Sequence, residues 1–600
     1  MSQNLFTDFP ERVEQLRKLC QLDQLALPLE EAFGEKGFYK SSNEAMDFYF
    51  GVLEELGKVA AQVIRPRAHL IDQKGAKLID GEVLLPKELE DNLSVLKDLG
   101  VFNSLASRSH GGFNMPQAVQ AMALEILAHA CPNTALTVAC YSMVPFLEAW
   151  GTEEQKQRIL PKLMTLEWRS SMALTEPNAG SDLGKLRTSA KRDGDRWIIN
   201  GSKIFITSGS GEVTFALVRT EANSSGLNGL SVLIVPRKIE GKDNYKVTKI
   251  EDKICLHGSP TCEIVFENSV GELLGPEGLG FKVMLDLMND ARLAMAALAI
   301  GIASSAREES LNHARQRVTM GKPILQHPMV ADMLFEMEME LRAMRAMVNE
   351  AAISFDLMRI AKKTEDEPQF KKWRKRYRRL TPLCKYYCCE KAITISRNAV
   401  QIFGGYGVCK EYPVERLLRE TIIYPIYEGT SQIQSLMVLK DTLKDVALQA
   451  TGFLSSLAGA WAESKVTLNP VKSNLLKARN ELNLAIKSIL MSIIKGKFKS
   501  DIDSLKNSKI QQFLKDYSLD LFAEKTDLTY PFLVAERFTR ITCDYYALKC
   551  LSDRLPEGDQ KAEQWVLNFA NLVLPRMKME NEYMNHRVLS TIDYMQRHTS

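Results

Sequence analysis

The sequence lacks several features that mark large protein classes. Its longest apolar run, about residues 293–303, is too short to span a bilayer and predicts a buried helix. No G-x-G-x-x-G follows a predicted strand, and no G-x-x-x-x-G-K-[ST] occurs. We therefore expect no transmembrane segment, and neither a Rossmann nor a P-loop nucleotide site.

Cysteine and excess charge are also scarce. Eleven Cys in 600 residues do not have the spacing of a disulfide framework, which fits a reducing compartment. A net charge of +3 gives no overall field for nucleic acid or anionic membranes. The first 21 residues lack the apolar stretch of a signal peptide and carry Asp8 and Glu11. We expect a cytoplasmic protein.

The pattern of apolar residues divides the chain into segments of different structure. Helical spacing dominates before residue 165 and after residue 285, whereas short runs rich in Val, Ile, Phe and Thr lie between them. This segregated order predicts an α+β multidomain fold and argues against a doubly wound α/β sheet. The predicted units are an N-terminal extension (1–43), an N-terminal helical domain (44–165), a central β domain (166–285), a C-terminal helical bundle (286–449) and an additional C-terminal helical domain (450–600).

Four segments are dense in residues suited to a binding site. They are A-L-T-E-P-N-A-G-S-D (173–182), N-G-S-K-I-F-I-T-S-G (200–209), Q-I-F-G-G-Y-G (401–407) and I-Y-E-G-T-S-Q-I-Q (426–434). Taken singly, each segment is typical of a turn or a helix start. Together, with their order and spacing, they resemble the acyl-CoA dehydrogenase family over about residues 44–445. The resemblance implies an N-terminal helical domain, a β domain and a four-helix bundle.

The resemblance implies that Glu428 is the catalytic base. Some relatives carry the base on an earlier helix, just before an Arg, but here Ala291 precedes Arg292. Asp290 is one position off and has a shorter side chain. The small neighbour Gly429 allows a thioester to come within hydrogen-bond reach of the Glu428 carboxylate.

The resemblance also implies FAD as cofactor. Arg317 is expected to meet the pyrophosphate of FAD in a neighbouring subunit, because a guanidinium suits phosphate in charge and geometry. Relatives commonly have a His-Gln pair where this sequence has His327-Pro328, which weakens one expected FAD contact. The implied FAD-binding residues are Leu174, Thr175, Phe205, Thr207, Arg317, Thr319, Gln401, Gly404, Gly405, Thr430 and Gln432. The implied substrate contacts are Ser181, Asn289, Arg292 and Gly429.

The activity that the resemblance implies is oxidation of an acyl-CoA to a trans-2-enoyl-CoA, as in fatty acid β-oxidation. Electron-transferring flavoprotein would be the acceptor, and the enzyme would be a homodimer or homotetramer. The length and the segments 253–262 and 287–293 resemble the long bacterial branch that includes 3-methylmercaptopropionyl-CoA dehydrogenase. That branch also holds enzymes for straight-chain substrates, so the acyl group stays open. The sequence also leaves open the alternative of an acyl-CoA oxidase, which reoxidises its flavin directly with oxygen.

A basic run supports a different class of function. Residues 371–379, K-K-W-R-K-R-Y-R-R, interleave positive charge with aromatic side chains, as nucleic-acid-binding segments can. One branch of the family is a DNA-associated flavoprotein of the alkylation response. We favour a solvated helix start and expect no nucleic acid partner. Cys384, Cys388 and Cys389 lack a matching second ligand pair, so we expect buried thiols and no metal.

Overall fold

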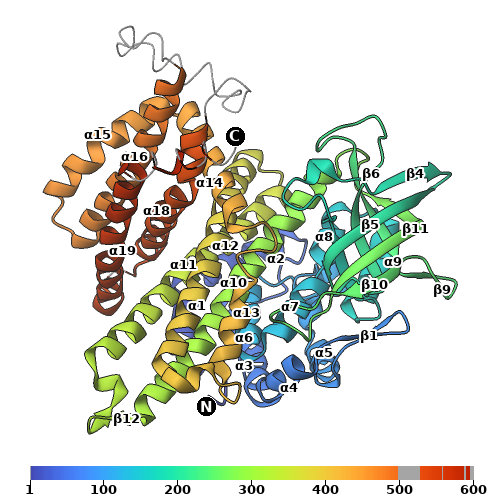
Figure 1. Ribbon diagram of the computed structural model, residues 1–600, viewed down its shortest axis with the longest axis horizontal. Coiled ribbons are helices and arrows are strands. Elements are labelled where there is room, and N and C mark those ends of the chain that lie inside the picture. Colours follow the sequence, from blue (N-terminus) through green and yellow to red (C-terminus); the bar gives the residue numbers. More distant parts are fainter. Residues whose placement is uncertain are drawn as a thin grey trace.

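The computed structural model describes residues 2–497, residues 528–586 except 557, and residues 590–592, 594 and 597. Figure 1 shows three parts in a row. A β domain lies at one end, long helices fill the middle, and a group of C-terminal helices lies at the other end. The predicted α+β arrangement with an extra C-terminal helical module is confirmed.

The N-terminal third is helical, with one small hairpin that the periodicity did not indicate. Arg12 of α1 is buried, and its Nε donates to Glu125 Oε1 on α6 at 2.8 Å. The first helices are therefore tied into the domain interior. The elements are α1 (Pro10–Leu19), α2 (Leu22–Ala32), α3 (Ser42–Val59), α4 (Ala68–Lys74), the hairpin β1 (Lys77–Ile79) and β2 (Glu82–Leu84), α5 (Lys87–Asp98), α6 (Gln117–Ala130), α7 (Pro132–Tyr141), α8 (Val144–Trp150) and α9 (Glu153–Met164).

The central domain is a seven-stranded sheet in the order β10-β11-β5-β4-β6-β3, with β7 pairing to both β11 and β6. Most pairs are antiparallel, as predicted, but β3 runs parallel to β6. Inward-facing Val, Ile, Leu and Phe residues form its core. The strands are β3 (Ser170–Ala173), β4 (Ser189–Asp193), β5 (Arg196–Thr207), β6 (Val213–Arg219), β7 (Leu230–Pro236), β10 (Lys246–Ile250) and β11 (Thr261–Leu274), with the small hairpin β8 (Lys238–Ile239) and β9 (Lys242–Asp243).

Three helices of more than 30 residues make up most of the bundle in the middle of the molecule (Figure 1). Gly301 of α10 permits close packing, because a Cβ there would lie 2.4 Å from the Glu125 carbonyl oxygen of α6. None of the described helices has the length and apolarity needed to cross a membrane. The bundle helices are α10 (Gly280–Gln316), α11 (Pro328–Lys363), α12 (Glu367–Phe403), α13 (Pro413–Ile422) and α14 (Ser431–Leu448).

The C-terminal module contains α15 (Ala450–Val466), α16 (Pro470–Lys497), α18 (Thr529–Asp553) and α19 (Gln560–His586). Arg576 of α19 attaches the module to the bundle by donating to Glu340 of α11 at 2.7 Å, and it also donates to Asp544 of α18 within the module. Glu340 also accepts from Lys391 of α12 at 2.8 Å. Residues 498–527 of the predicted 450–600 domain lie outside the described residues.

Candidate active site

Glu428 lies in a tight turn that precedes α14. Glu428 and Gly429 both have left-handed backbone angles, with φ of 56° and 90°. Thr430 caps the following helix, since its side chain accepts from the Ile433 N–H at 3.2 Å. Gln434 Nε2 donates to the carbonyl oxygens of Glu428 at 3.2 Å and Gly429 at 3.0 Å. The first turn of α14 thus holds the backbone that presents Glu428.

Two buried cations flank this turn. Arg292 of α10 is only 2% exposed, its Nη1 donates to Asn289 Oδ1 at 2.9 Å, and its Nε has no partner among the described residues. Lys385 of α12 is fully buried, and its Nζ donates to the Gly429 carbonyl oxygen at 2.8 Å. The sequence analysis missed Lys385. Its position among buried Cys384, Cys388 and other inward-facing residues of α12 is the signal that could have revealed it.

The surroundings of Glu428 change its acidity. Burial raises the pKa of the partly exposed Glu428 carboxyl, and the positive charges of Arg292 and Lys385 offset part of that rise. Burial also raises the pKa of the nearby Cys140 thiol to about 12, so the thiol stays neutral. A carboxylate whose pKa lies above its ordinary value is a stronger base, which is the property that removal of a weakly acidic C–H proton requires.

The segments 173–182 and 200–209 form one unit. Lys203 of β5 is fully buried and donates to Glu176 Oε1 and to the Leu174 carbonyl oxygen, each at 2.9 Å. The Ile204 N–H donates to the Thr175 carbonyl oxygen, also at 2.9 Å. Neither Lys203 nor Glu176 was among the predicted site residues. Both lie inside the quoted motifs, however, and a Lys inside a strand of apolar residues is itself a signal.

Phe205 stands out from this unit into solvent. It has a φ of 60° and a side chain that is 60% exposed. The register between β11 and β5 shifts here, since Cys262 faces Ile206 but Ile264 faces Lys203. Such a bulge redirects a side chain, and in this case it presents an aromatic face beside the 173–182 segment. Thr207 lies two residues further along β5, and Ser181 is exposed.

A second group of predicted residues lies at the opposite end of α10. Arg317 follows α10 and has its Cζ 5.8 Å from the Tyr406 ring centre. Thr319 Oγ1 lies 3.1 Å from His327 Nε2. From Arg292 to Arg317, α10 rises roughly 37 Å at about 1.5 Å per residue. This exposed surface therefore lies far along α10 from Arg292, the α10 cation that acts on Glu428. The group also contains Gln401, Gly404 and Gly405.

Gln432, another predicted FAD contact, is close to the C-terminal module. Its Nε2 donates to Glu536 Oε2 of α18 at 3.3 Å. The other carboxylate oxygen of Glu536 accepts from Tyr386 and from Arg540, at 3.1 and 2.9 Å. The module therefore contacts both α14 and α12 next to the candidate site.

Comparisons with known proteins identify this arrangement. The N-terminal, middle and C-terminal domain models of acyl-CoA dehydrogenases match residues 51–167, 171–269 and 278–443. The chain belongs to the acyl-CoA dehydrogenase family. It is an FAD-dependent oxidoreductase that acts on CH–CH groups.

Several relatives are similar to most of the chain. Cyclohexane-1-carbonyl-CoA dehydrogenase of Geobacter metallireducens is 32% identical over 401 residues, which cover 66% of this chain and 97% of the relative. 3-Methylmercaptopropionyl-CoA dehydrogenase of Ruegeria pomeroyi is 32% identical over 435 residues, 68% of this chain and 73% of the relative. An acyl-CoA dehydrogenase of Bacillus anthracis complexed with FAD shares the fold at a TM-score of 0.73 and 20% identity, covering 91% of this chain and 88% of its own. Its coverage extends beyond the three family domains.

The described residues fit the cofactor of an acyl-CoA dehydrogenase. An exposed aromatic at Phe205, beside the partly buried Thr175 and Thr207, suits a flat ring system. Gly404 and Gly405 leave open space where a Cβ would lie, so the backbone there can approach a ligand closely. Arg317 adds an exposed guanidinium suited to phosphate.

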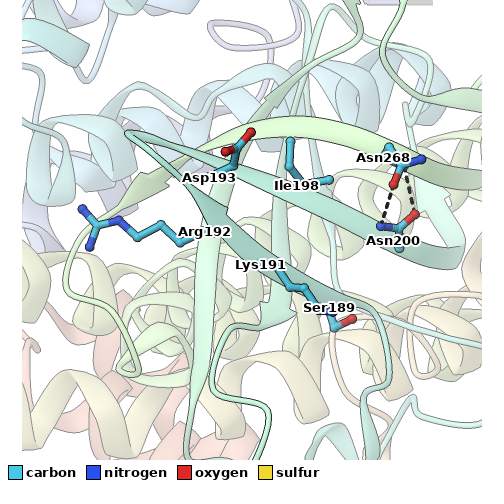
Figure 2. Close-up of a pocket in the computed structure, with 7 residues that line it drawn as sticks. All are labelled: Ser189, Lys191, Arg192, Asp193, Ile198, Asn200 and Asn268. Atoms are coloured by element: carbon cyan, nitrogen blue, oxygen red, sulfur yellow. Dashed lines mark hydrogen bonds between the residues drawn. The ribbon is translucent and has the colours of Figure 1, made fainter.

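A polar hollow on the β domain is a different surface (Figure 2). Its walls come from β4, β5 and β11, and Asn200 and Asn268 bond across it, with Nδ2 to Oδ1 at 3.2 Å. Arg192 points away from this pair in Figure 2. None of the predicted FAD, substrate or catalytic residues lines it. We therefore assign it no part in the acyl-CoA dehydrogenase site.

The basic run 371–379 belongs to the first turns of α12 and is largely paired. Lys375 lies 2.6 Å from Asp445, and Arg379 pairs with the same carboxylate. Arg378 lies 2.9 Å from Asp441. These acids on α14 neutralise much of the positive charge, which disfavours a phosphate-binding surface. The burial of Cys384, Cys388 and Cys389 raises the pKa of each thiol, so metal-binding thiolates are disfavoured as well.

Proposed function

We propose that the protein catalyses FAD-dependent α,β-dehydrogenation of an acyl-CoA to a trans-2-enoyl-CoA, with Glu428 as acceptor of the α-proton. The observation that carries this proposal is the Glu428 turn. It presents a partly buried carboxylate of raised pKa between the buried cations Arg292 and Lys385. The family provides the reaction, and this turn provides its base.

Each residue at the Glu428 turn would have a separate role in the reaction. The Glu428 carboxylate takes the α-proton, while bound FAD supplies the acceptor for the β-hydride. The Glu428 N–H makes no hydrogen bond among the described residues, so it is free to donate to the thioester carbonyl oxygen as negative charge develops there. Arg292 and Lys385 add positive potential on the same side. Gly429 keeps the approach to the carboxylate open.

We also propose that two subunits share each FAD. Leu174, Thr175, Phe205 and Thr207, with Thr430 and Gln432, would hold the flavin half in one subunit. The exposed surface at the far end of α10 would hold the pyrophosphate and adenosine of a neighbour's FAD through Arg317, Thr319, Gln401, Gly404 and Gly405. The length of α10 between Arg292 and Arg317 supports this division, because it separates the two groups of residues within one subunit.

The acyl group is the open part of the substrate. Relatives named for cyclohexane-1-carbonyl-CoA and 3-methylmercaptopropionyl-CoA are both 32% identical to this chain, so ring, sulfur-containing and straight-chain acyl groups all belong in a test. Ser181, Asn289 and Arg292 are the proposed substrate contacts. Electron-transferring flavoprotein is the proposed acceptor, rather than oxygen.

Anaerobic bleaching of the flavin absorbance tests this function. Purified protein would be mixed with cyclohexane-1-carbonyl-CoA, 3-methylthiopropionyl-CoA and straight-chain acyl-CoAs of increasing length. Rapid bleaching by one class identifies the substrate. The FAD-loaded protein bleaching with none of them would contradict the function. Peroxide formation at the rate of turnover in air would favour an oxidase instead.

A further inference from the structure

We propose that Lys385 is a positioning residue for the catalytic base, which clamps the Glu428–Gly429 turn through the Gly429 carbonyl and favours the ionised carboxylate. This inference rests on the proposed role of Glu428. It concerns a residue that lies outside all four sequence motifs. Lys385 reaches the turn from α12, whereas Gln434 reaches it from α14.

The burial of Lys385 is unusual for its chemistry. The side chain is fully buried, forms no ion pair among the described residues, and has the Gly429 carbonyl oxygen as its hydrogen-bond acceptor at 2.8 Å. Removing an ammonium from water is costly unless a partner compensates. An apolar side chain of similar length would avoid that cost. Stability alone therefore does not explain a Lys at this position.

The turn that Lys385 contacts needs external support. Glu428 adopts a left-handed conformation that residues with a Cβ rarely occupy. At Gly429, an added Cβ would lie 2.6 Å from Gln434 Nε2, so the turn is closely packed as well as strained. The Gly429 carbonyl oxygen accepts from both Lys385 and Gln434. Two helices thus fix one peptide group, and with it the direction in which Glu428 points.

The charge of Lys385 also acts on the base. The ionisable groups facing this region include Arg292 from α10, Cys140 from α7, Cys389 and Glu390 from α12, and Tyr424 and Tyr427 from the segment before the turn. Glu390 Oε1 accepts a hydrogen bond from the Ser431 hydroxyl at 2.5 Å. Lys385 and Arg292 are the two cations that oppose the effect of burial on Glu428. Without Lys385, the pKa of Glu428 is expected to rise.

The experiment compares three substitutions at two lysines of α12. Lys385→Met removes both the hydrogen bond and the charge, whereas Lys385→Gln retains a neutral donor for Gly429. Lys391→Met is the matched control, because Lys391 is on the same helix but pairs with Glu340 at 2.8 Å. Each variant is assayed for FAD content, thermal unfolding midpoint and the rate of anaerobic bleaching from pH 6 to 9. The probe is whichever of butyryl-CoA, octanoyl-CoA or 3-methylthiopropionyl-CoA reacts fastest with the unmodified protein.

The expected result is specific to Lys385. Lys385→Met should keep its FAD, lower the maximal rate at least tenfold, and move the acidic limb of the profile upward by about one pH unit. Lys385→Gln should show the same shift with a smaller loss of rate. Equal profiles for all three variants, or an unshifted profile in both Lys385 variants, would overturn the proposal. Unimpaired bleaching by Glu428→Gln would overturn the proposed function itself, which separates the two failures.

Discussion

Lys203 and Glu176 form a buried ion pair, with Nζ and Oε1 2.9 Å apart, between β5 and the segment that follows β3. Glu176 also accepts from the N–H groups of Arg187 and Thr188, at 2.7 and 3.0 Å. Burial lowers the pKa of Lys203 to about 8, against the attraction of Glu176. The pair makes the two segments expected to hold the flavin ring a single unit.

Breaking this pair from one side should be costly. Lys203→Met leaves Glu176 buried without its cation, and Glu176→Gln leaves Lys203 without its anion, so we expect each to cost about 3 to 5 kcal/mol of stability. The double variant should lose less than the sum of the two. Urea unfolding of all four proteins measures the coupling. Additive losses of stability in the double variant would contradict the coupling between the two side chains. Unchanged FAD content in the single variants would contradict the role of the pair in holding the flavin-binding segments together.

Phe205 provides a test of the flavin-covering role. Phe205→Ala should weaken FAD binding by about tenfold, since it removes an exposed aromatic face. Phe205→Trp should retain FAD. The dissociation constant, measured by flavin fluorescence with reconstituted protein, reports the effect. Ile79→Ala, at another exposed apolar residue on β1, serves as the control and should bind FAD normally. Equal affinities in the Ala variants would rule out the role.

Asp290 should make stability depend on pH. Burial raises the pKa of this carboxyl from 3.8 to about 7, and Tyr377 donates to it at 2.7 Å. The folded state therefore binds the proton more tightly than the unfolded state, so this contribution to stability is lost as pH rises from about 4 to 7. As pH rises from about 4 to 7, the free energy of unfolding of Asp290→Asn should increase by about 2 to 4 kcal/mol relative to that of the unmodified protein. A difference independent of pH would contradict this prediction.

The charge pairing of the basic run predicts no specific DNA binding. Because Lys375, Arg378 and Arg379 face Asp441 and Asp445, few free cations remain for phosphates. Mobility-shift titrations with duplex and single-stranded DNA at 50 and 200 mM salt should show no saturable complex. A complex whose affinity falls steeply with salt would revive the nucleic-acid-binding alternative.

The order of domains was predictable because it depends on local patterns. Helical and strand periodicities are visible in any window of the sequence, and the Gly-containing motifs mark turns at Gly404 and Gly429. The hairpin β1–β2 was not predicted, since its strands are three residues long and only partly apolar. Short strands leave too few positions to reveal a period of two.

The sequence motifs contain only part of the candidate site. Glu428, Thr430 and Phe205 lie within them, so their positions could be read directly. For Lys385, the apolar pattern of α12 could indicate burial but not the contact with Gly429, which is 44 residues away and depends on how α12 packs against the turn. Gln432 was expected at the cofactor, and its contact with Glu536 arises from the C-terminal module, 104 residues further along the chain.

Anaerobic mixing of the Glu428→Gln variant with the acyl-CoA that bleaches the unmodified protein tests the central claim most directly. Gln retains the size and a hydrogen-bonding group of Glu but cannot accept the α-proton. The account predicts normal FAD content, normal ligand-induced change of the flavin spectrum, and bleaching slowed by at least about 1,000-fold, consistent with loss of a general base. Bleaching at the rate of the unmodified protein would contradict the role of Glu428.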